Sequence, residues 1–322
     1  MTQPSLGDDH AAFRADLAAG RVTLERARPR WRDRLDGIMP QLAITPAFLA
    51  ALLLMVGSVL WTVYLSFTNA TLMPSYEFAG LISYEKLWAN PRWILAYTNL
   101  FIFSVLYIAL TLACGLGLAV LMDQNIRGEA LYRSILLYPM AISLVVTGTV
   151  WRWLFNPGTG IESFVRNLGW ANFDFDWIVQ KDKAIYVIVF TAIWQGSGFI
   201  MVLLLAGLRS VDANIVKAAQ IDGAPMSMIY RRIIFPAIGP IFLSCFIILL
   251  QHAVKTYELV TALTSGGPGT ATTVPALFVF DVFYARGQIG QGAAGAVMMM
   301  VALLIFLIPF NIYQRLRRRH EG

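Results

Sequence analysis

The stretch AIYVIVFTAIWQGSGFIMVLLLAGL, residues 184–208, contains no Asp, Glu, Lys or Arg. A helix needs about 20 such residues to cross roughly 30 Å of lipid hydrocarbon. Five more uncharged runs approach or exceed this length, at 41–76, 93–122, 134–151, 233–254 and 287–314. The 322-residue chain is 57% hydrophobic and 14% charged, whereas soluble domains are about 25% charged. The sequence therefore predicts an all-α membrane protein with six transmembrane helices.

The six predicted helices follow these runs, at about 42–67, 95–122, 135–155, 184–208, 237–262 and 292–314. A further uncharged run, 259–280, contains SGGPG and Pro275. Lipid does not tolerate the unpaired backbone groups of such a segment. We expect it to form the outer end of helix five, a loop and a short interfacial helix. The predicted organisation is a basic amino-terminal segment, a transmembrane domain and a basic tail, at 1–40, 41–314 and 315–322.

The basic residues predict the orientation of these helices. If both termini lie on the same side of the membrane, 17 of the 25 Lys and Arg residues lie on that side too. The positive-inside rule makes that side the cytoplasm. No apolar core precedes Pro40, so we do not expect a cleavable signal peptide. The net charge of +6 reflects topology, and no nucleic-acid partner is expected because the charge is divided among two tails and two short loops.

A compact polar segment follows the fourth predicted helix. Its first part, SVDANIVKAAQIDGA (210–224), predicts a short helix capped by Asp212. Gly223 can adopt the left-handed conformation that ends a helix, and Pro225 can begin a second one. Two short helices meeting at Asp222 and Gly223 would make a rigid knob, suited to enter a groove on another protein.

This segment carries a family resemblance. KAAQIDGAPMSMIYRRIIFP (217–236) resembles the cytoplasmic loop of binding-protein-dependent ABC transporter permeases, whose pattern is Glu-Ala-Ala, three residues, Gly, then Ile-x-Leu-Pro. The residues that match are Ala218, Ala219, Asp222, Gly223, Ala224, Ile233 and Pro236. Lys217 replaces the Glu of the pattern and Phe235 replaces the Leu. A charge contact made by that Glu in relatives is therefore not expected here.

Other blocks of the sequence resemble one particular branch of this family. LTSGGPGTAT (263–272) is similar to a signature of the maltose-permease-like branch of sugar importers. The blocks that look most like glucose and mannose permease subunits are PMAISLVVTGTVWRWLFNPGTG, WQGSGFIMVLLLAGLRSVD and RGQIGQGAAGAVMM, at 139–160, 194–212 and 286–299.

The resemblance implies a sugar permease subunit of the bacterial inner membrane. A coupling loop, 209–236, would bind a separate ATPase through Lys217, Ala218, Ala219, Asp222, Gly223 and Ala224. The implied partners are a second, different permease subunit, two copies of a cytoplasmic ATPase and an external sugar-binding protein. The sequence has no G-x-x-x-x-G-K-[ST] phosphate loop. We therefore expect ATP and Mg on the ATPase, no cofactor in this chain and no enzymatic activity of its own.

Helix five supplies candidate residues for the substrate pathway. In a continuous helix, Gln251, Lys255 and Glu258 share one face. Ionisable residues at membrane depth usually face a cavity or a partner. This face therefore borders a substrate path, seals the contact with the second permease or extends its charged groups toward the outer surface, and Lys255 could neutralise Glu258.

The resemblance places the sugar contacts of relatives on two helices. The corresponding positions here are Gly196, Phe199, Leu249, Ala253 and Thr256, several of them apolar. The pocket could therefore differ, or belong to the other permease. Trp194 and Gln195 add an aromatic face and an amide, although Trp194 is equally suited to packing.

Two other classes remain as alternatives. An ion- or proton-coupled secondary transporter could use Lys255 and Glu258 as a relay, but we find none of the internal repeats typical of such carriers. A membrane enzyme would need a nucleophile and base or a metal cluster. Three His and two Cys, scattered along the chain, do not favour one.

Overall fold

The computed structural model describes residues 19, 31–72, 77–124 and 126–320. These residues form helices and loops, with no β-structure among them beyond an isolated bridge between Thr68 and Phe78. The chain divides into two units, 1–60 and 61–322. Most of the basic segment predicted at 1–40 lies outside the described residues. Helix α2 (Trp31–Ser66) begins in the first unit and carries an apolar stretch over Ile44–Ser66.

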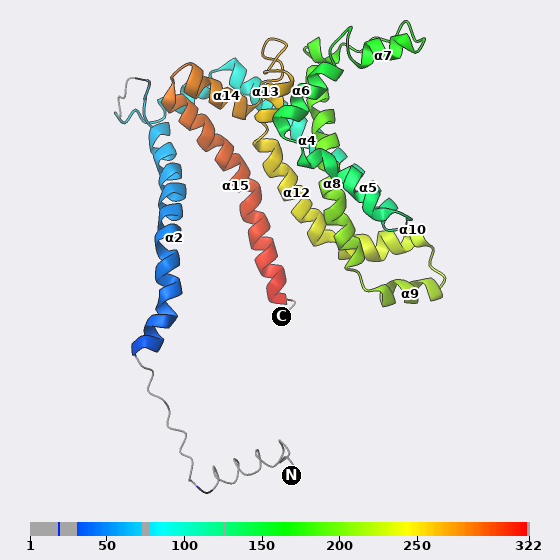
Figure 1. The fold of residues 1–322 in the computed structure, drawn as a ribbon. Coiled ribbons are helices and arrows are strands. Elements are labelled where there is room, and N and C mark those ends of the chain that lie inside the picture. Colours follow the sequence, from blue (N-terminus) through cyan, green and yellow to red (C-terminus); the bar gives the residue numbers. More distant parts are fainter. Residues whose placement is uncertain (1–18, 20–30, 73–76, 125, 321–322) are drawn as a thin grey trace, which may run out of the picture. The chain divides into compact units, whose positions relative to one another are not determined.

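The second unit contains the remaining helices (Figure 1). The long ones are α4 (Pro91–Met122), α5 (Glu129–Ala141), α6 (Leu144–Leu154), α8 (Ala184–Arg209), α12 (Gly239–Val254) and α15 (Ile289–His320). The short ones are α3 (Ile82–Trp88), α7 (Ile161–Asn167), α9 (Ala213–Ile221), α10 (Met226–Ile229), α11 (Phe235–Ala237), α13 (Glu258–Leu263) and α14 (Pro275–Phe280). One 3-10 turn, η1 (Trp177–Val179), and two π-helical turns, η2 (Tyr230–Ile234) and η3 (Asp281–Ala285), complete the described elements. Within this unit, α9 and α10 lie at one end and α7, α13 and α14 at the other.

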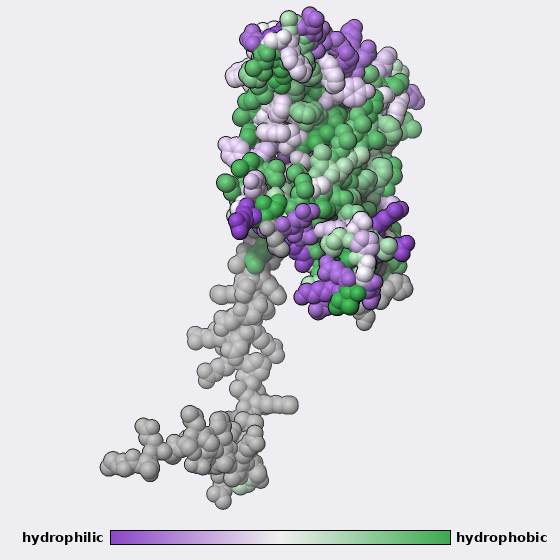
Figure 2. All heavy atoms as spheres, turned by 90° about the vertical axis from the view of Figure 1, so that its right-hand side faces the viewer, coloured by the Kyte–Doolittle hydropathy of each residue, from purple (hydrophilic) through white to green (hydrophobic). Residues whose placement is uncertain are grey.

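Among the described residues, four helices are long and apolar enough to cross a membrane. They are the Ile44–Ser66 part of α2, α4, α8 and the Ile289–Ile312 part of α15, and each matches a predicted helix. The number reaches six when each of two bent helix pairs is taken as one span: α5 with α6, and the segment Met226–Ala237 with α12, which meet at 66°. On the face drawn in Figure 2, hydrophilic residues gather at the two ends of the second unit, and hydrophobic residues fill the band between them. This distribution suits a bilayer.

The prediction of a continuous third helix over 135–155 is wrong. The segment forms α5 and α6, which meet at an angle of 95°. Ile142 and Ser143 between them have extended backbones, with ψ of 137° and 139°. Pro139 in the last turn of α5 has no N–H to donate. Composition over this segment is apolar enough for one helix, but its backbone hydrogen bonds are interrupted.

The prediction of a continuous fifth helix over 237–262 is also wrong. Helix α12 ends at Val254 and α13 begins at Glu258. At the break, the Thr256 hydroxyl donates to the carbonyl of His252 at 2.8 Å, and the Tyr257 N–H bonds the Lys255 carbonyl at 2.7 Å. Such local hydrogen bonds compete with the regular helical pattern. The regular helix is therefore interrupted between residues that the sequence placed on one face.

Close approach of backbones explains how the bundle packs. Helices α4 and α8 lie against each other over a core that includes Phe103, Ile200 and Met201. Gly115 permits this approach, since an added Cβ would lie 2.6 Å from a methyl carbon of Ile200. A Cβ at Gly198 would lie 1.9 Å from the Leu136 carbonyl oxygen of α5. In lipid, where burial of apolar side chains gives little net gain, such close packing is what holds helices together.

The segment that contains SGGPG folds onto α4. The Asn99 side chain of α4 donates to the carbonyls of Ala271 and Thr273 at 2.7 and 2.9 Å. These bonds pair backbone groups that lipid would leave unpaired. The short apolar helix predicted after this loop is present as α14 and η3, over Pro275–Ala285.

Candidate functional site

The coupling loop predicted at 209–236 contains the helix α9, Ala213–Ile221. The Asp212 side chain caps α9 by accepting from the Asn214 N–H at 2.8 Å. At the other end, the Ala224 N–H bonds the Ala219 carbonyl and the Gly223 N–H bonds the Gln220 carbonyl, each at 3.0 Å. This pattern is a Schellman motif, which requires a left-handed residue. Gly223, with φ of 79°, supplies it. The predicted cap and stop signals are both confirmed.

A second short helix, α10, follows after Pro225, which occupies the position before its first residue. No residue of α9 is buried. Among the predicted coupling residues, Lys217, Ala218, Asp222 and Gly223 are exposed, and Ala219 and Ala224 are partly so. Ile221, at the end of α9, is 86% exposed. Only Val216 and Ala219 of α9 are partly buried and pack against the core. A short capped helix that presents the rest of its surface, apolar side chains included, is typical of a docking element.

A cavity of about 390 Å³ lies between α8 and α12, within the range of roughly 300–1,000 Å³ that ligand pockets occupy. Residues from two helix breaks border it, the one between α5 and α6 and the one between α12 and α13. Its lining residues are Tyr107, Met140, Ile142, Leu144, Ala192, Gln195, Gly196, Phe199, Leu249, His252, Lys255, Thr256, Glu258 and Leu259.

Six of the eight predicted pathway residues line this cavity, namely Gln195, Gly196, Phe199, Lys255, Thr256 and Glu258. Trp194 and Gln251 lie outside the lining. The Trp194 ring packs against Trp151 with ring centroids 5.4 Å apart, so packing is the role that the contacts support. Of the positions mapped from the resemblance, Leu249 lines the cavity, whereas Ala253 does not.

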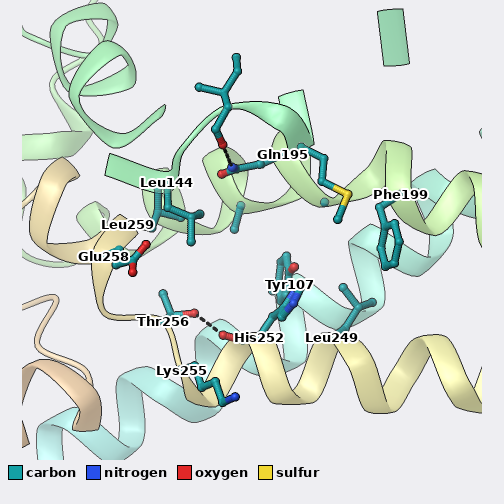
Figure 3. A pocket seen from close by; sticks show the side chains of 14 residues that line it. Tyr107, Leu144, Gln195, Phe199, Leu249, His252, Lys255, Thr256, Glu258 and Leu259 are labelled. Carbon is teal, nitrogen blue, oxygen red and sulfur yellow. Dashed lines mark hydrogen bonds between the residues drawn. The ribbon is translucent and has the colours of Figure 1, made fainter. Parts of the chain in front are cut away.

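Gln195 lines the cavity and also contacts the backbone at the break between α5 and α6. Its side-chain Nε2 donates to the Ile142 carbonyl at 2.9 Å (Figure 3), which pairs a backbone group freed by the break. Its Oε1 is buried and has no hydrogen-bond partner among the described residues. A buried acceptor without a partner costs free energy, so a hydroxyl group that reached this oxygen would gain a favourable hydrogen bond.

The predicted pairing of Lys255 with Glu258 is wrong. No ion pair joins them among the ion pairs of the described residues, and their side chains do not point toward each other (Figure 3). The helix break between them is the reason, because the three-residue spacing brings side chains together only in a continuous helix. The face that was to join Gln251, Lys255 and Glu258 is absent for the same reason.

Sequence reasoning missed several lining residues. The ring of Tyr107 enters the space between α8 and α12, but Tyr107 belongs to α4, and a single Tyr in an apolar helix gives no signal. His252 also lines the cavity, although the sequence favoured packing for it. Met140 and Ile142 lie beside Pro139, so a proline inside an apolar run was the signal that could have revealed them.

Comparison with known proteins identifies the family. The family model described as "Binding-protein-dependent transport system inner membrane component" matches residues 111–320. The chain belongs to this family. The matched range includes α9 and all the lining residues except Tyr107.

Individual relatives of the chain are also permeases by name. A probable ABC transporter permease protein of Pyrococcus horikoshii is 34% identical over 84% of this chain and 95% of its own length. The trehalose/maltose transport system permease protein MalF of Thermococcus litoralis is 28% identical over 86% and 94% of the two chains. For the xylose/arabinose import permease protein XacH of Haloferax volcanii, the identity is 31% over 75% and 76%.

A solved structure shares the fold. The structure of a bacterial ABC transporter involved in the import of the acidic polysaccharide alginate matches with a TM-score of 0.76. Its sequence is 20% identical, and the match covers 88% of this chain and 98% of that one. At this identity the likeness concerns the fold alone. It supports the arrangement of helices described here for the permease.

Proposed function

We propose that this permease is one membrane subunit of an ATP-driven importer that moves a sugar through the bacterial inner membrane. In this proposal six spans cross the bilayer, both termini are cytoplasmic, and α9 lies on the cytoplasmic side. The named relatives support a sugar as substrate, since two of them are sugar permeases by name. A monosaccharide of the glucose or mannose type, or a small glucoside, is the specific substrate that we propose.

The exposed helix α9 is the observation that carries the proposal. Helix α9 is capped but has no buried residue, so its exposed surface is available to bind a partner. In this proposal the partner is a groove on a separate ATPase subunit. ATP and Mg would bind to two copies of this ATPase, which closes on ATP and moves α9. A second, different permease and an external sugar-binding protein complete the proposed assembly. Lys217 would then face a groove residue different from the one that contacts Glu in relatives.

The cavity between α8 and α12 is the proposed sugar site. Phe199 and Tyr107 offer ring faces for the apolar side of a sugar, and the free Oε1 of Gln195 can accept from a sugar hydroxyl. Thr256 and Glu258 add polar groups on the opposite wall. A mainly apolar pocket with a few convergent polar groups is typical of a small-molecule site. A relay through Lys255 and Glu258, as in a secondary transporter, has less support because the two residues are not paired.

Replacement of Gly223 by Trp tests the coupling role. Nothing lies within 4 Å of a Cβ added at Gly223, so a bulky side chain would project into the partner groove. We expect Gly223→Trp to abolish sugar uptake and to prevent co-purification of the ATPase, while the permease still inserts. Gly80→Trp is the control, because Gly80 has a φ of 62° and equally open surroundings but lies outside the coupling loop. Normal uptake with Gly223→Trp would refute the proposal.

The partners and the substrate class can be tested together. The assembly should be purified through a tag on this chain and its ATPase activity measured with candidate sugar-binding proteins. We expect a binding protein loaded with its sugar to stimulate hydrolysis. If no ATPase subunit co-purifies with the unmodified chain, the proposed assembly is wrong.

A further inference from the structure

Both ends of the coupling loop contact the same turn of the bundle. This turn, residues 123–128, connects α4 to α5. Arg209, the last residue of α8, approaches it from one end of the loop, and Tyr230, the first residue of η2, from the other. Between these two contacts lies α9, which has no buried residue. Val216 and Ala219 are the residues of α9 that pack against the core, so the two ends of the loop offer a further, polar route by which motion of α9 can reach the bundle.

The Arg209 guanidinium contacts the turn and the two residues that flank it. Its Nη1 donates to Glu129 Oε1 at 2.8 Å, and its Nη2 donates to the Met122 carbonyl at 3.2 Å. Its Nε lies 3.8 Å from Asp123 Oδ1. Arg133 of α5 also pairs with Glu129. One planar, five-donor group thus joins the last residue of α4, the turn and the first residue of α5 to the end of α8.

Tyr230 secures the other end. Its hydroxyl donates to Asp123 Oδ2 at 3.2 Å, and its ring packs against Phe235 with centroids 5.9 Å apart. Asp123 is thus shared by residues that stand at opposite ends of the coupling loop. We call the four side chains of Arg209, Tyr230, Asp123 and Glu129 the loop clamp.

We propose that the loop clamp makes the coupling loop and the α4–α5 turn move as one body, so that α5 carries the displacement of α9 to the cavity. This inference rests on the proposed function. Helix α5 runs from Glu129 in the clamp to Ala141, and Met140 and Ile142 at its far end line the cavity. Without the clamp, motion of α9 is absorbed by the connecting residues. The four residues are positioning residues, since they touch neither ATP nor the proposed sugar site.

The solvent exposure of the loop clamp distinguishes a role in transmitting motion from a role in stabilising the fold. The side chains of Arg209, Asp123 and Glu129 are 41%, 27% and 25% exposed. Ion pairs with this much solvent contact contribute little to stability. We therefore expect clamp variants to insert and assemble in normal amounts, while transport per ATP hydrolysed falls.

The experiment measures sugar uptake and ATP hydrolysis by the complete transporter in proteoliposomes. We expect Arg209→Ala to lower the ratio of uptake to hydrolysis at least about fivefold, the lower end of typical coupling effects. Arg209→Lys should restore part of the ratio, because an ammonium keeps the charge but cannot reach three acceptors in a planar fork. Tyr230→Phe keeps the ring and removes only the hydroxyl, so it should lower the ratio without affecting assembly. The double change should cost less than the sum of the two.

Arg127→Ala is the matched control. Arg127 lies in the same turn, is exposed and forms no ion pair with any residue that the structure describes. An unchanged ratio in both Arg209→Ala and Tyr230→Phe, or an equal loss in Arg127→Ala, would overturn the clamp. If Gly223→Trp abolishes uptake while the clamp variants remain coupled, the inference fails and the proposed function stands. If Gly223→Trp transports normally, the proposed function itself has failed.

Discussion

At the scale of single residues, two glycines in apolar helices have opposite surroundings. An added Cβ at Gly198 would lie 1.9 Å from the Leu136 carbonyl oxygen, whereas nothing lies within 4 Å of one at Gly117. A backbone atom cannot move aside as a flexible side chain can. The contact between α5 and α8 therefore depends on the absence of a single methyl group.

We predict that Gly198→Ala destabilises the permease by about 1–3 kcal/mol, the usual cost of overpacking a close contact. Gly117→Ala should leave stability unchanged or raise it slightly, since Ala favours helix. Thermal unfolding of the two variants in detergent provides the comparison. Equal unfolding temperatures would show that α5 and α8 are not in this contact.

Gln195 and Gln251 form a second matched pair, because both were predicted from the sequence and only Gln195 lines the cavity. Gln195→Leu keeps the size of the side chain and removes both the acceptor and the hydrogen bond to the Ile142 carbonyl. We expect it to raise the KM for sugar uptake by about 2–10-fold, as the loss of one neutral hydrogen bond implies. Gln251→Leu should leave KM unchanged. A KM that responds to Gln251 and not to Gln195 would place the sugar elsewhere.

At the scale of elements, the helix ends were easier to predict than the helix breaks. The cap of α9 depends on side chains adjacent in sequence, Asp212 and the Asn214 N–H, so a local signal suffices. The breaks at Ile142 and at Thr256 occur inside runs whose composition would support a continuous helix. What maintains the first is a bond from Gln195, 53 residues away.

The cap of α9 gives a prediction of its own. Asp212→Ala should destabilise this nine-residue helix by about 1 kcal/mol and reduce uptake, because the helix has no buried side chain to compensate. Asp212→Asn retains an oxygen that can accept from the Asn214 N–H and should preserve most of the activity. Uptake assays of the two variants at equal expression test this. Equal loss in both would mean that the charge matters rather than the cap.

The break between α12 and α13 predicts how Lys255 and Glu258 behave together. Since they form no ion pair, the effects of Lys255→Ala and Glu258→Ala on uptake should add, with a coupling energy within about 0.5 kcal/mol of zero. A double-mutant cycle measures this energy directly. Strong coupling would indicate a continuous helix in the assembled transporter.

At the scale of the whole second unit, many large apolar side chains are exposed along the long helices, among them Phe101, Trp153 and Ile305, which are 71%, 68% and 62% exposed. Lipid or partner subunits must cover such a surface in a membrane protein. The belt of hydrophobic residues between polar ends in Figure 2 also indicates a surface that is covered by lipid or by partner subunits.

We predict that this chain alone, reconstituted in liposomes, does not take up sugar in response to an ion or proton gradient. Uptake should appear only when the ATPase, the second permease, the binding protein and internal ATP are present, because the chain has no phosphate loop. Gradient-driven uptake by the isolated chain would revive the secondary-transporter alternative.

The sequence alone determined the class of protein, four of its long helices, the cap and stop signals of α9 and about half of the lining of the cavity. These features depend on composition and on neighbours a few residues apart, where helix length, capping and backbone conformation are decided. Tertiary structure decided where the third and fifth predicted helices break, and so separated Lys255 from Glu258 and left Gln251 out of the cavity. It also brought Arg209 and Tyr230 to one turn. Those outcomes depend on hydrogen bonds and close contacts between segments far apart in the chain, which no local pattern encodes.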